Sequence, residues 1–196
     1  MRVATWNVNS IRSRTGRVVD WLGREDVDVL AMQEIKCTEA QFPFDAFLEA
    51  GYEVELHGLN QWNGVAIASR LPMTDVAIGF ENIPGFGKPL DDGSLPLEAR
   101  AIGDTVNGVR LWSLYVPNGR ELDNPHYAYK LDWLANLTED TRRWLEDRGF
   151  FVIDNLPPAL IPKVAELGRD REGSRFALVV DTRAGEYLPD LESALA

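Results

Sequence analysis

The chain has 196 residues, of which 45% are hydrophobic and 26% charged, with a net charge of −11. This composition is typical of a globular domain with a substantial core, and it holds no run of roughly 18 apolar residues, so we expect no membrane partner. The negative charge argues against broad electrostatic binding of nucleic acid, although a local basic groove or a bound metal can still hold a phosphate. The only cysteine is Cys37, which excludes a disulfide within the chain and favours a cytoplasmic location.

The first two expected strands both end in polar side chains. A strand over residues 2–9 delivers Asn7 and Asn9, and a second apolar run, Val29 to Met32, stops just before Glu34. A carboxylate at the carboxyl end of a buried strand lies where the active sites of layered α/β folds gather. Carboxylate and amide oxygens suit a hard cation such as Mg²⁺. The alternative is that Glu34 only marks where the strand reaches water.

The following segments alternate helix and strand at first and then become a run of hairpins. Helices are expected over 17–24 and from Thr38 onward, the second with Phe44, Phe47 and Leu48 on its inner face. Strands are expected over 52–56, 65–69, 73–80, 99–106 and 109–116, with hairpin signals at Asn63-Gly64 and Asn107-Gly108 and a long loop over 81–96. This order predicts an α/β (α+β) fold with a mixed sheet and helices outside it.

Two further features follow the second hairpin. Pro117 stops the last strand, so Tyr115 is held near a strand end, a suitable place for a hydroxyl that orients a phosphate. The alternative for Tyr115 is an ordinary half-buried strand aromatic. A long amphipathic helix is expected from an N-cap at Asn124 to Arg148. Its apolar face would hold Tyr127, Leu131, Leu134, Leu137 and Trp144.

Six short segments of the first 145 residues resemble, in order and spacing, the N-terminal half of the exonuclease III family of DNA-repair phosphodiesterases. They are Thr5-Trp-Asn-Val-Asn-Ser-Ile-Arg12, Met32-Gln-Glu-Ile-Lys36, Asn63-Gly-Val-Ala66, Glu98-Ala-Arg100, Tyr115-Val-Pro-Asn-Gly119 and Tyr129-Lys-Leu131. The resemblance implies a partial αββα sandwich, with DNA as the partner. It further implies that Glu34 binds the catalytic Mg²⁺ (or Mn²⁺), that Asn7 supports this metal site, and that Tyr115 contacts the scissile phosphate.

Two parts of that family's site are missing from the sequence. No Gly-Asp-X-Asn motif, which supplies the aspartate that activates water, follows the long helix, and no Ser-Asp-His ending is present. The two histidines, His57 and His126, lie upstream of the family's catalytic position and are interpreted as ordinary surface or loop residues. A substitute carboxylate is conceivable at Asp154 or Asp181, because each follows a buried-strand run; the alternative is that each caps a turn.

The last fifty residues resemble a different family. Asp154-Asn-Leu-Pro-Pro158 and Ala177-Leu-Val-Val-Asp-Thr-Arg183 are similar to the nucleotide-binding domain of the RNase adapter (RapZ-like) family, in which Asp181 and Arg183 match a nucleotide-contacting stretch. The phosphate-binding Gly-X-X-X-X-Gly-Lys-[Ser/Thr] loop of that family is absent from the sequence. The chain is therefore interpreted as an exonuclease III-like half, 1–145, joined to a fragment, 146–196. This fragment is expected to form a βαβα tail with strands at 150–153 and 176–180, and Pro157 and Pro158 would open its first helix.

These features together predict a Mg²⁺-dependent phosphodiesterase of DNA repair, acting at 3′ ends and abasic sites, whose activity is near background. We expect weak DNA binding. We also expect a largely absent second sheet, whose missing cover would expose an apolar face and drive self-association. The alternatives are a catalytically dead binding module and a nucleotide- or RNA-linked adapter that works through the tail.

Overall fold

The structure is a computed structural model that describes residues 1–153, 160–169 and 175–178. The chain divides into two compact units, Met1–Leu137 and Thr138–Ala196, which are described separately. Within the described residues, no helix is both long enough and apolar enough to cross a membrane.

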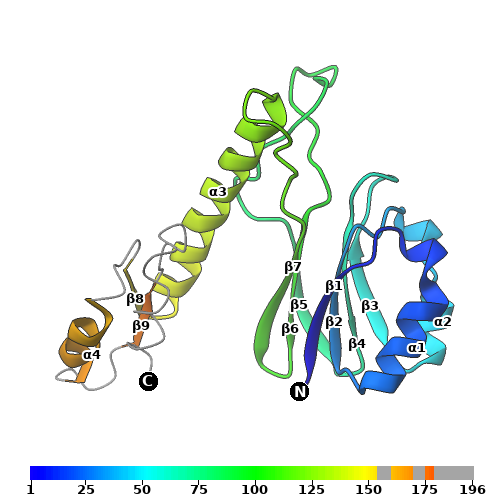
Figure 1. Cartoon of the computed structure of the whole chain (residues 1–196), viewed down its shortest axis with the longest axis horizontal. Helices are drawn as coiled ribbons and strands as arrows, with labels where there is room; N and C mark the ends of the chain where they lie inside the picture. The colour runs from blue at the N-terminus through cyan, green and yellow to red at the C-terminus, as the bar shows by residue number, and fades with distance from the viewer. Residues whose placement is uncertain (154–159, 170–174, 179–196) are drawn as a thin grey trace. The chain divides into compact units, whose positions relative to one another are not determined.

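The first sheet of the first unit, sheet A, has four strands in the order β1-β2-β4-β3. Its strands are β1 (Val3–Asn7), β2 (Val29–Gln33), β3 (Glu53–His57) and β4 (Val65–Ser69). β1 and β2 are parallel, and the crossover between them contains a 3-10 turn, η1 (Ile11–Ser13), and helix α1 (Thr15–Glu25). Figure 1 shows α1 and the short α2 (Phe44–Glu49) on the same face of this sheet, where Val18, Leu22 and Phe47 are buried against its strands.

The opposite face of sheet A is covered by a second antiparallel sheet, sheet B. It consists of β5 (Met73–Ile78), β6 (Ala101–Val106) and β7 (Val109–Leu114), in that order. Apolar residues from both sheets form one buried cluster between them: Val29, Val65 and Ile67 from sheet A, with Ile102 and Val106 from sheet B. The expectation that the second sheet is largely absent is therefore wrong, since three strands are present and packed.

The turn between β6 and β7 follows directly from its sequence. Asn107 and Gly108 have φ of 49° and 78°, the positive values that a two-residue hairpin turn needs to match the twist of its strands. The other expected hairpin signal, Asn63-Gly64, is not a tight turn. It lies at the end of a longer connection, residues 58–64, because the antiparallel pairing of β3 with β4 begins at His57 and Val65.

The helix expected from Thr38 onward differs in detail from the structure. The segment after Thr38 forms a 3-10 turn, η2 (Glu39–Gln41), and α2 begins only after Pro43, whose ring cannot continue a helix. Phe47 is buried as expected, but Phe44 and Leu48 are 37% and 67% exposed, which corrects the predicted inner face.

The long helix α3 (Pro125–Asp147) begins where the sequence predicts, and the Oδ1 of Asn124 accepts the backbone N–H of His126 at 3.0 Å. Its buried residues in the first unit are Tyr129 and Trp133, whereas Leu131 is 49% exposed. The Trp133 ring packs at 5.2 Å from Phe80, which in turn contacts Trp112 of β7. The start of α3 is thus linked to sheet B through the ring of Phe80, beside the predicted partial αββα sandwich.

The second unit contains the strand-helix-strand pattern predicted for the tail. β8 (Phe150–Ile153) and β9 (Arg175–Leu178) pair in parallel, and α4 (Ile161–Arg169) lies between them in the chain. Pro157, Pro158 and the expected final helix lie outside the described residues.

Candidate functional site

Three loops meet at the carboxyl end of sheet A, and backbone hydrogen bonds join them. The loop after β1 contacts the loop after β2 through the N–H of Ser10, which donates to the carbonyl of Glu34 at 2.7 Å. The loop after β2 contacts the segment before β4, because Ile35 N–H donates to Gly64 O at 3.2 Å and Lys36 N–H donates to Asn63 O at 2.9 Å. The position of Glu34 is therefore fixed by main-chain contacts from both sides.

The backbone at this point is in a conformation that L-residues rarely adopt. Asn9, Ser10, Glu34 and Lys36 all have positive φ, at 42°, 81°, 55° and 53°. Each such residue costs on the order of 1–3 kcal/mol and persists only where its surroundings fix it. Four such residues lie in two adjoining loops. The surrounding contacts at this edge of the sheet therefore hold the backbone in a conformation that these residues would not adopt by themselves.

The Glu34 carboxylate is held by two side chains. Asn7 Nδ2 donates to its Oε1 at 2.7 Å and the Lys36 ammonium lies 2.9 Å from its Oε2, while Tyr115 lies near enough to help lower the pKa of Glu34. Burial alone would raise the pKa of Glu34, but the hydrogen bond from Asn7 and the Lys36 charge outweigh it and lower the pKa below its usual value. Glu34 is thus ionised at neutral pH, in the form that binds a cation.

Tyr115 lies between Glu34 and a buried arginine. The Arg100 guanidinium lies 4.6 Å from the centre of the Tyr115 ring, and its Nη1 donates to the Tyr115 carbonyl at 3.2 Å. Arg100 is itself held by Glu98, whose Oε2 accepts from Nε at 2.7 Å. Burial and the nearby Glu34 charge raise the pKa of Tyr115, so its hydroxyl keeps its proton and can act as a donor.

A polar pocket of about 340 Å³ opens beside Tyr115. Its wall includes Trp62, Asn63, Arg100, Asn118, Arg120 and His126. Trp62 is 70% exposed, whereas Asn63 is 1% exposed, with its Nδ2 donating to Glu98 and its Oδ1 left without a partner among the described residues. A pocket with two arginines, amides and an exposed indole has the chemistry to hold a phosphate and an adjoining planar group.

Sequence reasoning named Glu34, Asn7 and Tyr115 but missed most of their neighbours. The structure brings these three residues together, while their roles in metal and phosphate binding stay predictions. Lys36, Arg100 and the pocket residues other than Tyr115, Asn118 and His126 were not singled out, although the segments Met32–Lys36 and Glu98–Arg100 contain several of them. His126, interpreted as an ordinary loop residue, lies on the pocket wall, with its ring centre 4.4 Å from that of Phe86.

The side chains around Glu34 offer a divalent cation only one direct protein ligand. No group of three or more His, Cys, Asp or Glu side chains with metal-binding spacing occurs among the described residues. Both ends of the Asn7 amide are already used, since Oδ1 accepts the N–H of Asn9 at 3.1 Å and Nδ2 donates to Glu34. Glu34 would thus be the direct protein ligand, which suits Mg²⁺ that keeps most of its waters. Three other candidates, Asp154, Asp181 and Arg183, lie outside the described residues.

The first unit is thus a two-sheet sandwich with outer helices and a carboxylate-centred site at one end of sheet A. The chain belongs to the endonuclease/exonuclease/phosphatase family, which it matches over residues 4–158. Residues 139–196 match a second family, the RapZ-like N-terminal domain.

Solved structures resemble the chain along much of its length. An AP endonuclease from Archaeoglobus fulgidus is 38% identical with a TM-score of 0.62, over 73% of this chain and 52% of that one. The 3′-5′ exonuclease NExo from Neisseria meningitidis is 30% identical with a TM-score of 0.66, over 99% of this chain and 71% of that one.

Several curated relatives match the C-terminal part. A nucleotide-binding protein from Ruminiclostridium cellulolyticum is 58% identical over 55 residues, which cover 27% of this chain and 19% of that protein. A nucleotide-binding protein from Symbiobacterium thermophilum is 51% identical over 55 residues, covering 27% and 18%. The chain thus spans about a fifth of these curated relatives and about half of the archaeal enzyme.

Proposed function

We propose that the chain binds a DNA phosphodiester at Glu34 and Tyr115 with the help of Mg²⁺ or Mn²⁺, and that its hydrolytic activity is strongly impaired. The observation that carries this proposal is the convergence of Asn7, Glu34 and Tyr115 beside a pocket with two arginines. Support comes from the solved relatives, which are described as an AP endonuclease, a 3′-5′ exonuclease and a 3′ phosphatase bound to product DNA. Abasic sites and 3′ ends are accordingly the proposed substrates.

Each residue of the site has a distinct part in this proposal. Tyr115 donates its hydroxyl hydrogen to a phosphate oxygen, and Arg100 fixes the plane of the tyrosine ring. Asn7 orients the Glu34 carboxylate, which would hold the cation. A bound Mg²⁺ supplies positive charge that neutralises the phosphoryl oxygens. Arg120 gives this acidic chain a local positive charge with which to hold DNA, whereas the charge of Arg100 is balanced by Glu98, which also lines the pocket.

Impairment follows from what the sequence lacks. No Gly-Asp-X-Asn or Ser-Asp-His segment occurs in it, so the water-activating aspartate and the charge-stabilising histidine of the family have no counterpart by sequence. Loss of one such group commonly lowers a rate by roughly 10²–10⁴-fold. Loss of both is expected to leave hydrolysis near background while binding remains.

The test combines binding and cleavage. Purified chain is titrated with Mn²⁺ and with a labelled abasic duplex, and a Glu34→Ala variant is compared with Glu53→Ala, an exposed glutamate on β3. We expect Mn²⁺-assisted DNA binding that Glu34→Ala removes and Glu53→Ala keeps, with cleavage near background. Cleavage at rates typical of enzymes, abolished by Glu34→Ala, would refute the proposed impairment. DNA binding that is equally strong without Mn²⁺ and in the Glu34→Ala variant would instead indicate a catalytically dead binding module.

A second candidate function rests on the C-terminal part. The 58% identity over 55 residues to a nucleotide-binding protein favours a nucleotide- or RNA-linked adapter role for it. The absence of a Gly-X-X-X-X-Gly-Lys loop from the sequence argues against tight triphosphate binding. Nucleotide or RNA binding that is lost in Arg183→Ala, but kept in Arg175→Ala, would support the adapter.

A further inference from the structure

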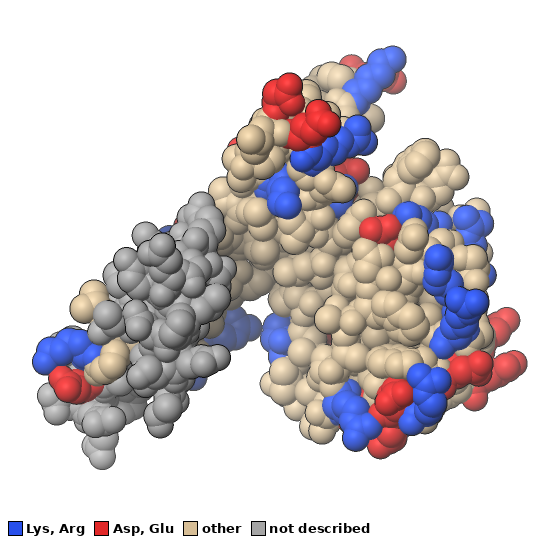
Figure 2. Space-filling view, viewed as in Figure 1, with Lys and Arg blue, Asp and Glu red and all other residues tan. Residues whose placement is uncertain are grey.

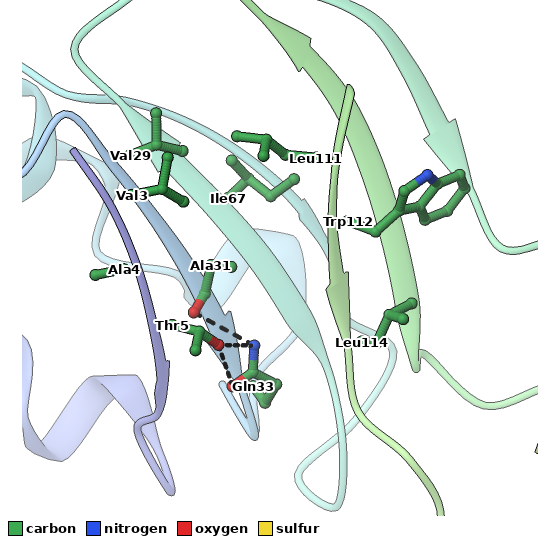
Figure 3. A pocket seen from close by; sticks show the side chains of 10 residues that line it. All are labelled: Val3, Ala4, Thr5, Val29, Ala31, Gln33, Ile67, Leu111, Trp112 and Leu114. Atoms are coloured by element: carbon green, nitrogen blue, oxygen red, sulfur yellow. Dashed lines mark hydrogen bonds between the residues drawn. The ribbon is translucent and has the colours of Figure 1, made fainter. Parts of the chain in front are cut away.

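The two sheets of the first unit are open on one side. There, a cavity of about 360 Å³, the inter-sheet slot, lies between the edge strands β1 and β7. Figure 3 shows Val3, Val29, Ile67 and Leu111 pointing toward one another across it. No residue that lines the slot carries a charge. The apolar layer between the sheets therefore continues to the surface instead of being closed by another element of this unit.

The polar groups in the slot already have partners. Gln33 Nε2 donates to Thr5 Oγ1 and to Ser113 Oγ, both at 3.1 Å, and Ser113 Oγ donates to Met32 O at 2.7 Å. These bonds link β1, β2 and β7. A ligand that needs several hydrogen bonds would thus find few free groups here, and an apolar surface is the better fit.

The strand at the rim of the slot lacks the features that normally protect an edge. Sheets A and B have four edge strands, and three carry charge or irregularity. β3 presents Glu53 and Glu55, β5 has a register shift around Asp75, and β7 carries Arg110. β1 is the exception, because Val3–Asn7 contains no charge, proline or bulge. Such an edge is a template for pairing with another strand.

Charge decides between the candidate occupants. Nucleic acid would need cations, and a basic protein would need carboxylates, yet the slot offers neither. A second copy of this chain has the same net charge of −11, so it can approach only through an uncharged contact. Figure 2 shows that the middle of the first unit, over β1 and its neighbours, is largely free of charged side chains, whereas charges gather over α1.

We propose that two copies of the chain associate through β1, antiparallel across a two-fold axis, and close both slots. Antiparallel pairing of a strand with itself satisfies the free edge on both copies with one contact. Centred on Thr5, it sets Val3 opposite Asn7 and Ala4 opposite Trp6, so no like charges face each other. The two four-stranded sheets become one continuous sheet, and the Val3 side chains extend the apolar wall under β7.

The experiment is sedimentation velocity of the full chain over a wide concentration range, with a matched pair of variants. Val3→Lys places a charge at the proposed contact, and Val76→Lys places the same charge on β5; the two valines are 46% and 43% exposed. We expect wild type to form a dimer and Val3→Lys to weaken it by about tenfold or more, because each contact would then place an unpaired lysine charge against the apolar slot. Val76→Lys should match wild type.

Hydrogen exchange of the unaltered protein gives a second readout that does not depend on a variant folding. The β1 amides should become more protected as protein concentration rises. A chain that is monomeric at all concentrations would overturn the proposal, whether β1 exchanges freely or is protected by another part of the same chain. A dimer that Val76→Lys breaks and Val3→Lys does not would also overturn it.

Discussion

Replacing Gly64 with alanine tests whether backbone packing fixes the position of Glu34. Gly64 has φ of 110°, and an added Cβ would lie 2.6 Å from Cγ1 of the fully buried Ile35. The strained conformation costs about 1–3 kcal/mol, and the overlap adds about 1–3 kcal/mol because Ile35 has no room to retreat. We therefore expect Gly64→Ala to lower the free energy of unfolding by about 2–6 kcal/mol.

Gly23→Ala is the matched control, because it should change the free energy of unfolding in the opposite direction. Gly23 lies in α1 and an added Cβ would meet nothing within 4 Å, so alanine there should raise the free energy of unfolding by about 0.5–1 kcal/mol. Urea unfolding followed by tryptophan fluorescence reports mainly on the first unit, which holds Trp6, Trp21, Trp62, Trp112 and Trp133, whereas Trp144 lies in the second. Mn²⁺ affinity should fall together with stability in Gly64→Ala, because the Gly64 carbonyl accepts the N–H of Ile35. An unfolding free energy equal to that of wild type would refute this account of the site.

Three further outcomes are expected. Ser113→Ala, which removes the hydroxyl that joins the two sheets, should lower the unfolding free energy by about 1–3 kcal/mol, while the exposed Ser13→Ala changes it by less than about 0.5 kcal/mol; urea titration measures both. Burial raises the pKa of Asp104 above its usual 3.8, so the folded state holds this proton to higher pH than the unfolded state, and stability falls as pH rises from about 4. Asp104→Asn should remove this pH dependence, so the variant should exceed wild type in unfolding free energy by more at neutral pH than at acidic pH. An equal difference at both pH values would contradict a raised pKa for Asp104. Burial also raises the pKa of Cys37 to about 11, so a thiol reagent at neutral pH should label the native protein slowly and the urea-unfolded protein quickly; fast native labelling would show that Cys37 is accessible.

Local patterns predicted most of the strands. β2 and β4 were clear because an unbroken apolar run is what a strand buried on both faces requires, and the Asn107-Gly108 turn has residues suited to its positive φ. The inner face of α3 was not predictable from leucine spacing. It is set by contacts of Tyr129 and Trp133 with Phe86 and Phe80, rings that lie far away in the sequence.

The centre of the site was predictable to a similar degree. Glu34 stood out as a carboxylate at the end of a buried strand, and the resemblance added Asn7 and Tyr115. Lys36 and Arg100 were missed because their importance lies in pairing: Lys36 bonds to Asn9, and Arg100 packs on Tyr115. Such pairings between distant segments leave no periodic signal in a single sequence.

The positive φ at Glu34 also bears on how this family member can change over time. Glycine at this position would relieve the backbone and stabilise the fold, yet it would remove the carboxylate that is the proposed cation ligand. Stability and function thus favour different residues at position 34. A Glu34→Gly variant should therefore unfold at a higher urea concentration than wild type while it loses the proposed cation ligand.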